Sequence, residues 1–184
     1  MTDKYIYLDH AATTPMDKEV IAVMNNFFTE NYANANSLHK QGQIAKRAIE
    51  QSRSTISQLL NCNPNELFFT SGATEANNWV LQGTYQYWKN RRKKEGSDLG
   101  IHFIISDFEH PAITEVARDF LAKEANVKIT YISPERNGLV NVEKIKAAIT
   151  EETVLISLIY ANNEIGTIQS IVELGEILKE INAD

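Results

Sequence analysis

The chain has 184 residues, which is enough for one domain with a sizeable core. It carries 24 acidic and 18 basic residues, and the resulting net charge of -6 argues against a general nucleic-acid-binding surface. A single cysteine, Cys62, excludes an internal disulfide and suits a reducing, cytoplasmic compartment. The N-terminus lacks a signal-peptide pattern, and no apolar run reaches the roughly 20 residues that span a bilayer. We therefore expect a protein without membrane association.

The first third of the chain has the pattern of helices joined by polar turns. We predict a short extended segment at residues 5–8 and a helix at residues 18–29, where apolar side chains recur at helical spacing. Ser37 is the predicted N-cap of a long helix that ends near Leu60. Residues 66–70 form a short apolar run that predicts a buried strand.

Predicted strands and helices then alternate along the chain. The predicted strands after the first are residues 101–106, 127–132 and 153–159, and the predicted helices are residues 74–94, 111–123, 142–149 and 171–181. The strands are apolar throughout, as buried parallel strands are, so this order predicts an α/β layered fold. Ser170 and Glu173 are predicted to form a capping box at the start of the last helix.

The segment Ser71-Gly72-Ala73-Thr74 is the most informative part of the sequence, because it lies between an apolar run and a long predicted helix. This order places free backbone N–H groups and a hydroxyl at the positive end of a helix, where an anion such as phosphate binds. The loop has one glycine and lacks the lysine of a Walker loop, so neither common nucleotide-binding motif fits. A phosphate site of another kind is expected.

Three polar loops follow successive predicted strands: Thr70 to Thr74, Asp107 to His110, and Ala161 to Gly166. Each loop taken singly also suits an ordinary turn or helix cap. Ligands of open α/β sheets bind outside the carboxyl ends of the strands, so loops that converge on that edge favour a ligand site. We predict that Thr74, His110 and Asn163 gather in one cleft.

One basic run, Lys89 to Lys94, stands out near the end of a predicted helix. Cations suit a helix C-terminus, so the run is interpreted as a solvated helix end. The alternative is a nucleic-acid or partner-binding patch.

Five motifs, in order along nearly the whole chain, resemble the N-terminal half of cysteine desulfurases. These enzymes belong to the class V branch of fold-type I pyridoxal-phosphate enzymes. The motifs are Tyr7 to Pro15, Ser37-Leu38-His39, Phe69 to Asn78, Glu109 to Ala112, and Ala161 to Gln169. Together they are specific, whereas any one of them alone is weak. The variants are most similar to the housekeeping and nitrogen-fixation type of desulfurase.

The resemblance implies that pyridoxal 5'-phosphate is the cofactor and that four residues bind it. Ala73 and Thr74 would hold the phosphate, and Asn163 would donate a hydrogen bond to the phenolate oxygen of the ring. His110 would stack on the ring and act as the catalytic acid–base. No metal site is implied.

The resemblance also implies a reaction, in which L-cysteine gives L-alanine and an enzyme-bound persulfide. A sulfur-acceptor protein such as an iron–sulfur scaffold would receive the sulfur, and the enzyme would be a homodimer. His10 and Ala11 would lie near the substrate. The family fold is the three-layer pyridoxal-phosphate-dependent transferase-like large domain. Residues 1–14 would be an N-terminal arm of the small domain and substrate site, and residues 15–184 the first part of the large domain.

Two departures from the family pattern are visible. Ala35 stands where the family usually has proline. The family's Schiff-base lysine, the aspartate at the pyridine nitrogen with its glutamine neighbour, the substrate-binding arginine and the persulfide cysteine all lie further along than Asp184. We therefore expect a domain truncated before its later strands, in which neither Lys40 nor Cys62 takes over a missing role. There are two alternatives. The first is another class V enzyme, such as a selenocysteine lyase or an aminotransferase, and the second is a non-catalytic fragment or interaction module.

Overall fold

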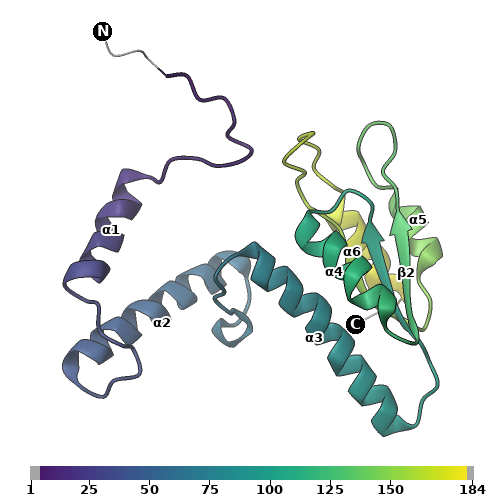
Figure 1. Cartoon of the computed structure of the whole chain (residues 1–184), viewed down its shortest axis with the longest axis horizontal. Coiled ribbons are helices and arrows are strands. Elements are labelled where there is room, and N and C mark those ends of the chain that lie inside the picture. The colour runs from purple at the N-terminus through teal and green to yellow at the C-terminus, as the bar shows by residue number, and fades with distance from the viewer. Residues whose placement is uncertain (1–4, 182–184) are drawn as a thin grey trace. The chain divides into compact units, whose positions relative to one another are not determined.

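A computed structural model describes residues 5–181 and is shown in Figure 1. Its residues form two units that divide between Phe69 and Thr70. Within the described part of the chain, no helix has both the length and the apolar character needed to cross a membrane.

The first unit is helical. It contains α1 (Lys18–Thr29), α2 (Lys40–Leu60) and a 3-10 turn, η1 (Pro64–Glu66). The predicted bounds of the first helix are confirmed. Its N-cap is Asp17, whose carboxylate accepts a hydrogen bond from the Glu19 N–H. Residues 5–8, predicted to be extended, belong to no strand.

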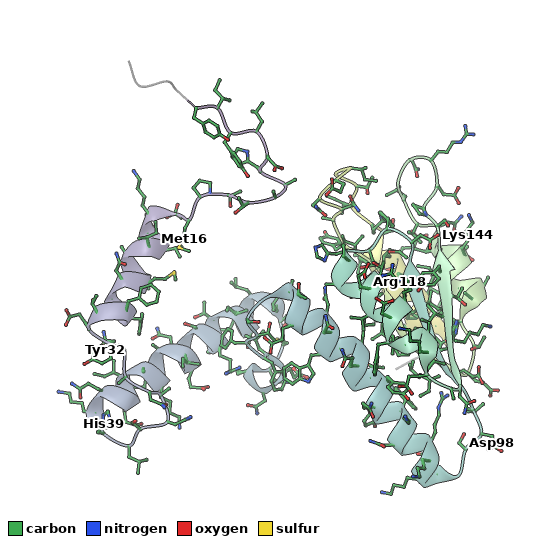
Figure 2. The ribbon with its side chains drawn as sticks, in the orientation of Figure 1. Met16, Tyr32, His39, Asp98, Arg118 and Lys144 are labelled. Atoms are coloured by element: carbon green, nitrogen blue, oxygen red, sulfur yellow. The ribbon has the colours of Figure 1, made fainter. Side chains whose placement is uncertain are left out.

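The start of α2 differs from the prediction, because His39 and not Ser37 is its N-cap (Figure 2). The His39 Nδ1 atom accepts a hydrogen bond from the backbone N–H of Gly42 at 3.3 Å. Ser37 lies in a preceding turn, where its N–H donates to the Asn34 carbonyl at 3.0 Å. That turn packs closely on the helix, since a Cβ at position 42 would lie 2.4 Å from the Ser37 carbonyl oxygen. Only glycine, which has no Cβ, therefore fits at position 42.

The strand predicted at residues 66–70 is wrong. Glu66 ends η1, and residues 67–70 pair with no strand in the described part of the chain. The Arg53 side chain instead donates to the Leu67 carbonyl, and its guanidinium lies 4.9 Å from the centre of the Phe69 ring. A side chain of α2 thus holds this apolar segment in an irregular conformation.

The second unit is built on a parallel sheet of three strands in the order β2-β1-β3. The strands are β1 (Ile101–Ser106), β2 (Val127–Ile132) and β3 (Thr153–Ser157). Both pairings are parallel, so the carboxyl ends of all three strands lie at one edge of the sheet. The first two strands have the predicted bounds, and β3 ends at Ser157, before the predicted Ile159.

Helices cover both faces of this sheet and create two apolar cores. They are α3 (Ala73–Glu95), α4 (Pro111–Asp119) with a following 3-10 turn η2 (Leu121–Lys123), α5 (Val142–Ala148) and α6 (Ile171–Ile181). Phe103 and Ile105 of β1 pack with α3 and α4, whereas Ile104 packs with α5 and α6. Successive side chains of a strand point to opposite faces, so this alternation builds three layers. The predicted α/β layered fold with a parallel sheet is confirmed.

The basic run at the end of α3 was interpreted from the sequence as a solvated helix end. The structure differs, because one residue of the run is buried. Arg91 pairs with Glu95 at 3.0 Å, but Arg92 is only 6% exposed. The Arg92 guanidinium lies 5.5 Å from the Trp88 ring centre, and its Nη2 atom donates to the Glu152 carbonyl at 3.4 Å. One cation of the run therefore belongs to the packing of α3 on the sheet.

A buried histidine links the three strands. His102 of β1 is completely buried, and its Nδ1 and Nε2 atoms each lie 2.8 Å from a hydroxyl oxygen, of Thr153 in β3 and Thr130 in β2 respectively. Burial lowers the pKa of the His102 imidazole below its usual value of 6.5. The nearby positive charge of Lys128 lowers this pKa further, and the negative charge of Glu152 partly opposes the effect.

We expect acid to destabilise the fold through His102. Because its pKa is lower in the folded than in the unfolded chain, the unfolded chain binds the proton more tightly. The stabilising contribution of the neutral ring is therefore complete above pH 6.5 and is lost as the pH falls towards the folded-state pKa. The slope of unfolding free energy against pH cannot exceed about 1.4 kcal/mol per pH unit for one proton.

Thermal unfolding between pH 7.5 and 5 measures this slope. The His102→Gln variant, which keeps a donor and an acceptor but does not titrate, should show a flatter profile. Equal slopes in both proteins would contradict this assignment.

Candidate functional site

The first turn of α3 is an open helix end. No acceptor within the described residues pairs with the backbone N–H groups of Ala73, Thr74 and Glu75, and the preceding Gly72 offers no capping side chain. A Cβ at Gly72 would meet no atom within 4 Å, so the space beside this residue is open. Free N–H groups at the positive end of a helix of this length are suited to an anion such as phosphate.

The backbone N–H of Ser71 is not free, unlike those of Ala73 and Thr74. The Ser71 N–H and hydroxyl both donate to one carboxylate oxygen of Glu75, at 2.6 and 2.7 Å. The expectation of free N–H groups in the segment Ser71 to Thr74 is therefore wrong for Ser71. These hydrogen bonds lower the pKa of Glu75, because they stabilise its charged form. The chain's own carboxylate thus occupies the outer part of the loop, and Ala73 and Thr74 remain free.

His110 lies in the loop after β1 and is the N-cap of α4. Its Nδ1 atom accepts a hydrogen bond from the Ala112 N–H at 3.1 Å. In the neutral ring this assigns the proton to Nε2, since an accepting nitrogen carries none. Pro111 supports the arrangement, because proline is favoured at the first position of a helix. The Nε2 side of an exposed ring is thereby left available to a ligand.

The loop after β3 is organised by Asn162, which the sequence analysis did not select. Asn162 is buried, and its Oδ1 atom accepts hydrogen bonds from the N–H groups of Glu164 at 2.9 Å and Ile165 at 3.0 Å. Asparagine followed by a turn that ends in glycine, here Gly166 at a φ of 73°, is the sequence signal of such an Asx turn. The predicted site residue Asn163 is exposed, and its amide donates to the Glu164 carboxylate at 3.0 Å.

Gln169 closes the base of the same loop. This buried side chain accepts a hydrogen bond from the Val140 N–H at 2.8 Å and donates to the Gly138 carbonyl at 2.9 Å. Ala161 and Ile168 form an antiparallel bridge between the two arms of the loop. The loop that carries Asn163 therefore has a fixed base.

The loops after β1 and β3 are joined directly. Glu109, next to His110, accepts hydrogen bonds from the Ser106 hydroxyl at 2.7 Å and from the Ile159 N–H at 2.5 Å. The structure thus connects the segment of His110 with the one that leads to Asn163. No hydrogen bond joins Thr74 to either residue among residues 5–181, so a single cleft for all three stays a prediction.

His10 and Ala11 belong to the first unit and lie in an exposed turn. The Ala12 N–H closes this turn on the Asp9 carbonyl at 3.2 Å. The His10 ring meets the Tyr7 ring edge to face, with 5.2 Å between the ring centres. Their proximity to a substrate stays a prediction.

Lys40 and Cys62 lie at the two ends of α2. Lys40 is its first residue. Cys62 follows the left-handed C-cap residue Asn61, and its N–H donates to the Ser57 carbonyl at 3.0 Å. Both positions are explained by the helix ends, and neither needs a catalytic role.

Comparison with known proteins assigns the family. The aminotransferase class-V family matches residues 6–183. The chain belongs to the class-V aminotransferase family.

Its similar members include proteins named cysteine desulfurase IscS. The one from Clostridium botulinum (strain Kyoto / Type A2) is 45% identical over 180 residues, which are 98% of this chain and 43% of the relative. The IscS of Methanosarcina thermophila is 39% identical over 178 residues, covering 97% of this chain and 42% of the relative. The chain thus spans less than half the length of these class-V relatives.

Several solved structures share the fold. A NifS-like protein superposes with a TM-score of 0.85 at 34% identity, over 96% of this chain and 46% of that protein. SspA in complex with cysteine gives a TM-score of 0.84 at 32% identity, over 96% of this chain and 48% of that protein. This chain therefore corresponds to less than half of each of these solved proteins.

Proposed function

We propose that this chain is the N-terminal, cofactor-binding part of a pyridoxal-phosphate-dependent cysteine desulfurase. The observation that carries the proposal is the open first turn of α3, where the N–H groups of Ala73 and Thr74 are free. The residues present fit the phosphate of the cofactor, since free N–H groups and the Thr74 hydroxyl are its usual donors. The similarity to proteins named IscS supports the same reaction class.

The chain's own residues would hold and orient the cofactor. Ala73 and Thr74 would bind its phosphate, His110 would stack on its ring, and Asn163 would donate a hydrogen bond to its phenolate oxygen. Asn163 is exposed, and among residues 5–181 its amide donates only to the neighbouring Glu164, so it is available for this bond. When bound, pyridoxal phosphate supplies an electron sink for the bonds at the substrate's Cα atom.

His110 is the proposed catalytic acid–base of this half. Its Nδ1 atom is engaged with the Ala112 N–H, so Nε2 is the ring nitrogen left to a ligand. To take up a proton at Nε2, the ring would have to carry its own proton on Nδ1 and give up this cap bond. Histidine titrates close to neutral pH, which suits an acid–base that works in both directions.

The proposed substrate is L-cysteine, and SspA, solved with cysteine, is a structural neighbour. The substrate's sulfur would pass to a cysteine thiol of the whole enzyme, leaving L-alanine and a persulfide. His10 and Ala11 would lie near the substrate. A sulfur acceptor such as an iron–sulfur scaffold, a homodimer and a cytoplasmic location are parts of the same proposal.

The test is product analysis with the whole enzyme, pyridoxal phosphate, L-cysteine and a thiol reductant. We expect alanine and sulfide in equal amounts, since the reductant releases each persulfide sulfur as sulfide. Turnover of selenocysteine alone would identify a selenocysteine lyase, and amino-group transfer to a keto acid without sulfide would identify an aminotransferase. Either result, or no turnover of any of these substrates, would overturn the proposal.

A further inference from the structure

Glu109 makes hydrogen bonds to two different strand ends, which the sequence did not predict. It is half-buried at the carboxyl edge of the sheet, immediately before His110. Its Oε1 atom accepts the Ser106 hydroxyl at 2.7 Å and the Ile159 N–H at 2.5 Å. Ser106 ends β1, and Ile159 lies just beyond the end of β3. One carboxylate oxygen therefore joins the ends of two neighbouring strands.

We propose that Glu109 is a positioning residue that fixes His110 relative to the loop of Asn163, an inference that rests on the proposed function of these two residues. Among residues 5–181, the His110 side chain is hydrogen-bonded within its own segment, to the Ala112 N–H. Nothing in that bond fixes the segment against β3, and the Glu109 carboxylate supplies the missing link.

A second, weaker contact supports the same link. The Asn162 amide donates to the Phe108 carbonyl at 3.4 Å. The loop after β1 is therefore hydrogen-bonded to the segment after β3 at two places, through Glu109 and through Phe108. The bonds to Glu109 are the stronger ones, because a charged acceptor makes shorter and stronger hydrogen bonds than a neutral one. With both ties in place, His110 and Asn163 keep a set separation before any cofactor arrives. Groups held in this way need less reorganisation when a ligand binds.

The experiment uses the 184-residue chain without cofactor and three variants. Glu109→Ala removes the acceptor. Glu109→Gln keeps an acceptor oxygen at the same position without the charge. Glu115→Ala is the matched control, since this exposed carboxylate of α4 pairs with Arg118 and has no bond to β3. Two NMR readouts are compared, namely amide hydrogen exchange of Ile159 and the ring carbon–proton signals of His110.

We expect Glu109→Ala to accelerate exchange at Ile159 by about tenfold or more, which corresponds to the loss of one charge-assisted hydrogen bond. The ring signals of His110 should shift or broaden in this variant. Glu109→Gln should restore most of both properties, and Glu115→Ala should leave both unchanged.

Unchanged His110 signals in a folded Glu109→Ala protein would overturn the proposal, even with faster exchange at Ile159, because Glu109 would then be only structural. If Glu109→Ala does not fold, Ser106→Ala replaces it and removes one of the two donors. In that variant, too, unaltered His110 signals would overturn the proposal. Neither readout requires cofactor or substrate. A failure here is therefore distinct from a failure of the proposed function, which is decided by the products of the whole enzyme.

Discussion

The 184 residues by themselves are expected to release no sulfide from L-cysteine, and to bind pyridoxal phosphate weakly. Ala73, Thr74, His110 and Asn163 offer a phosphate cradle, a stacking face and one hydrogen bond. They include neither a lysine to anchor the cofactor covalently nor a carboxylate to keep its pyridine nitrogen protonated. Without these two groups the electron sink is poorly held and poorly tuned. Sulfide release from cysteine, together with an absorbance titration with the cofactor, measures both properties.

A full-length relative, such as the Clostridium botulinum IscS, assayed under the same conditions, is the positive control for this experiment. Turnover by residues 1–184 on the order of 1 s⁻¹ or more, an ordinary enzyme rate, would contradict the expectation. It would mean that a lysine of this chain anchors the cofactor.

In the whole enzyme, His110→Ala is expected to slow turnover by about 10²–10⁴-fold, the usual contribution of a general acid–base. The physical reason is the loss of the imidazole, the group proposed to move a proton during turnover. Steady-state kinetics with L-cysteine as substrate measures the effect.

The alanine variant also removes the N-cap of α4, which by itself costs about 1 kcal/mol of stability. His110→Asn separates the two effects, since asparagine is a good N-cap without acid–base chemistry near neutral pH. We expect the asparagine variant to be as stable as the wild type and as slow as His110→Ala. Normal turnover in the asparagine variant would leave His110 a purely structural role.

The sequence predicted the second unit well, because its elements are specified locally. Strands such as β1 are continuous apolar runs, and α4 is preceded by His110 and started by Pro111. The carboxyl ends of β1 and β3 follow from parallel pairing, so the neighbourhood of the His110 and Asn163 loops was predictable in outline.

The misjudged features depend on side chains distant in sequence or on competing local bonds. The apolar residues 67–70 suited a strand, but the Arg53 side chain binds the Leu67 carbonyl. Arg92 belongs to a basic run, yet it packs beneath the Glu152 carbonyl, sixty positions away. Neither Glu109 nor Asn162 was predicted as a site residue, because their bonds across the sheet edge leave no periodic pattern in the sequence.

The hydroxyl–imidazole–hydroxyl line through His102 has a consequence for how the sheet assembles. Strands that are apolar on both faces, like β1, carry little information about alignment, because a slide by two residues buries much the same surface. Such a slide would place Ile104 where His102 now lies between the Thr130 and Thr153 hydroxyls. The buried ring would then lose both partners, at a cost of about 1–3 kcal/mol for each unsatisfied group. The two hydrogen bonds of His102 therefore favour the observed strand alignment over shifted alignments when the sheet forms.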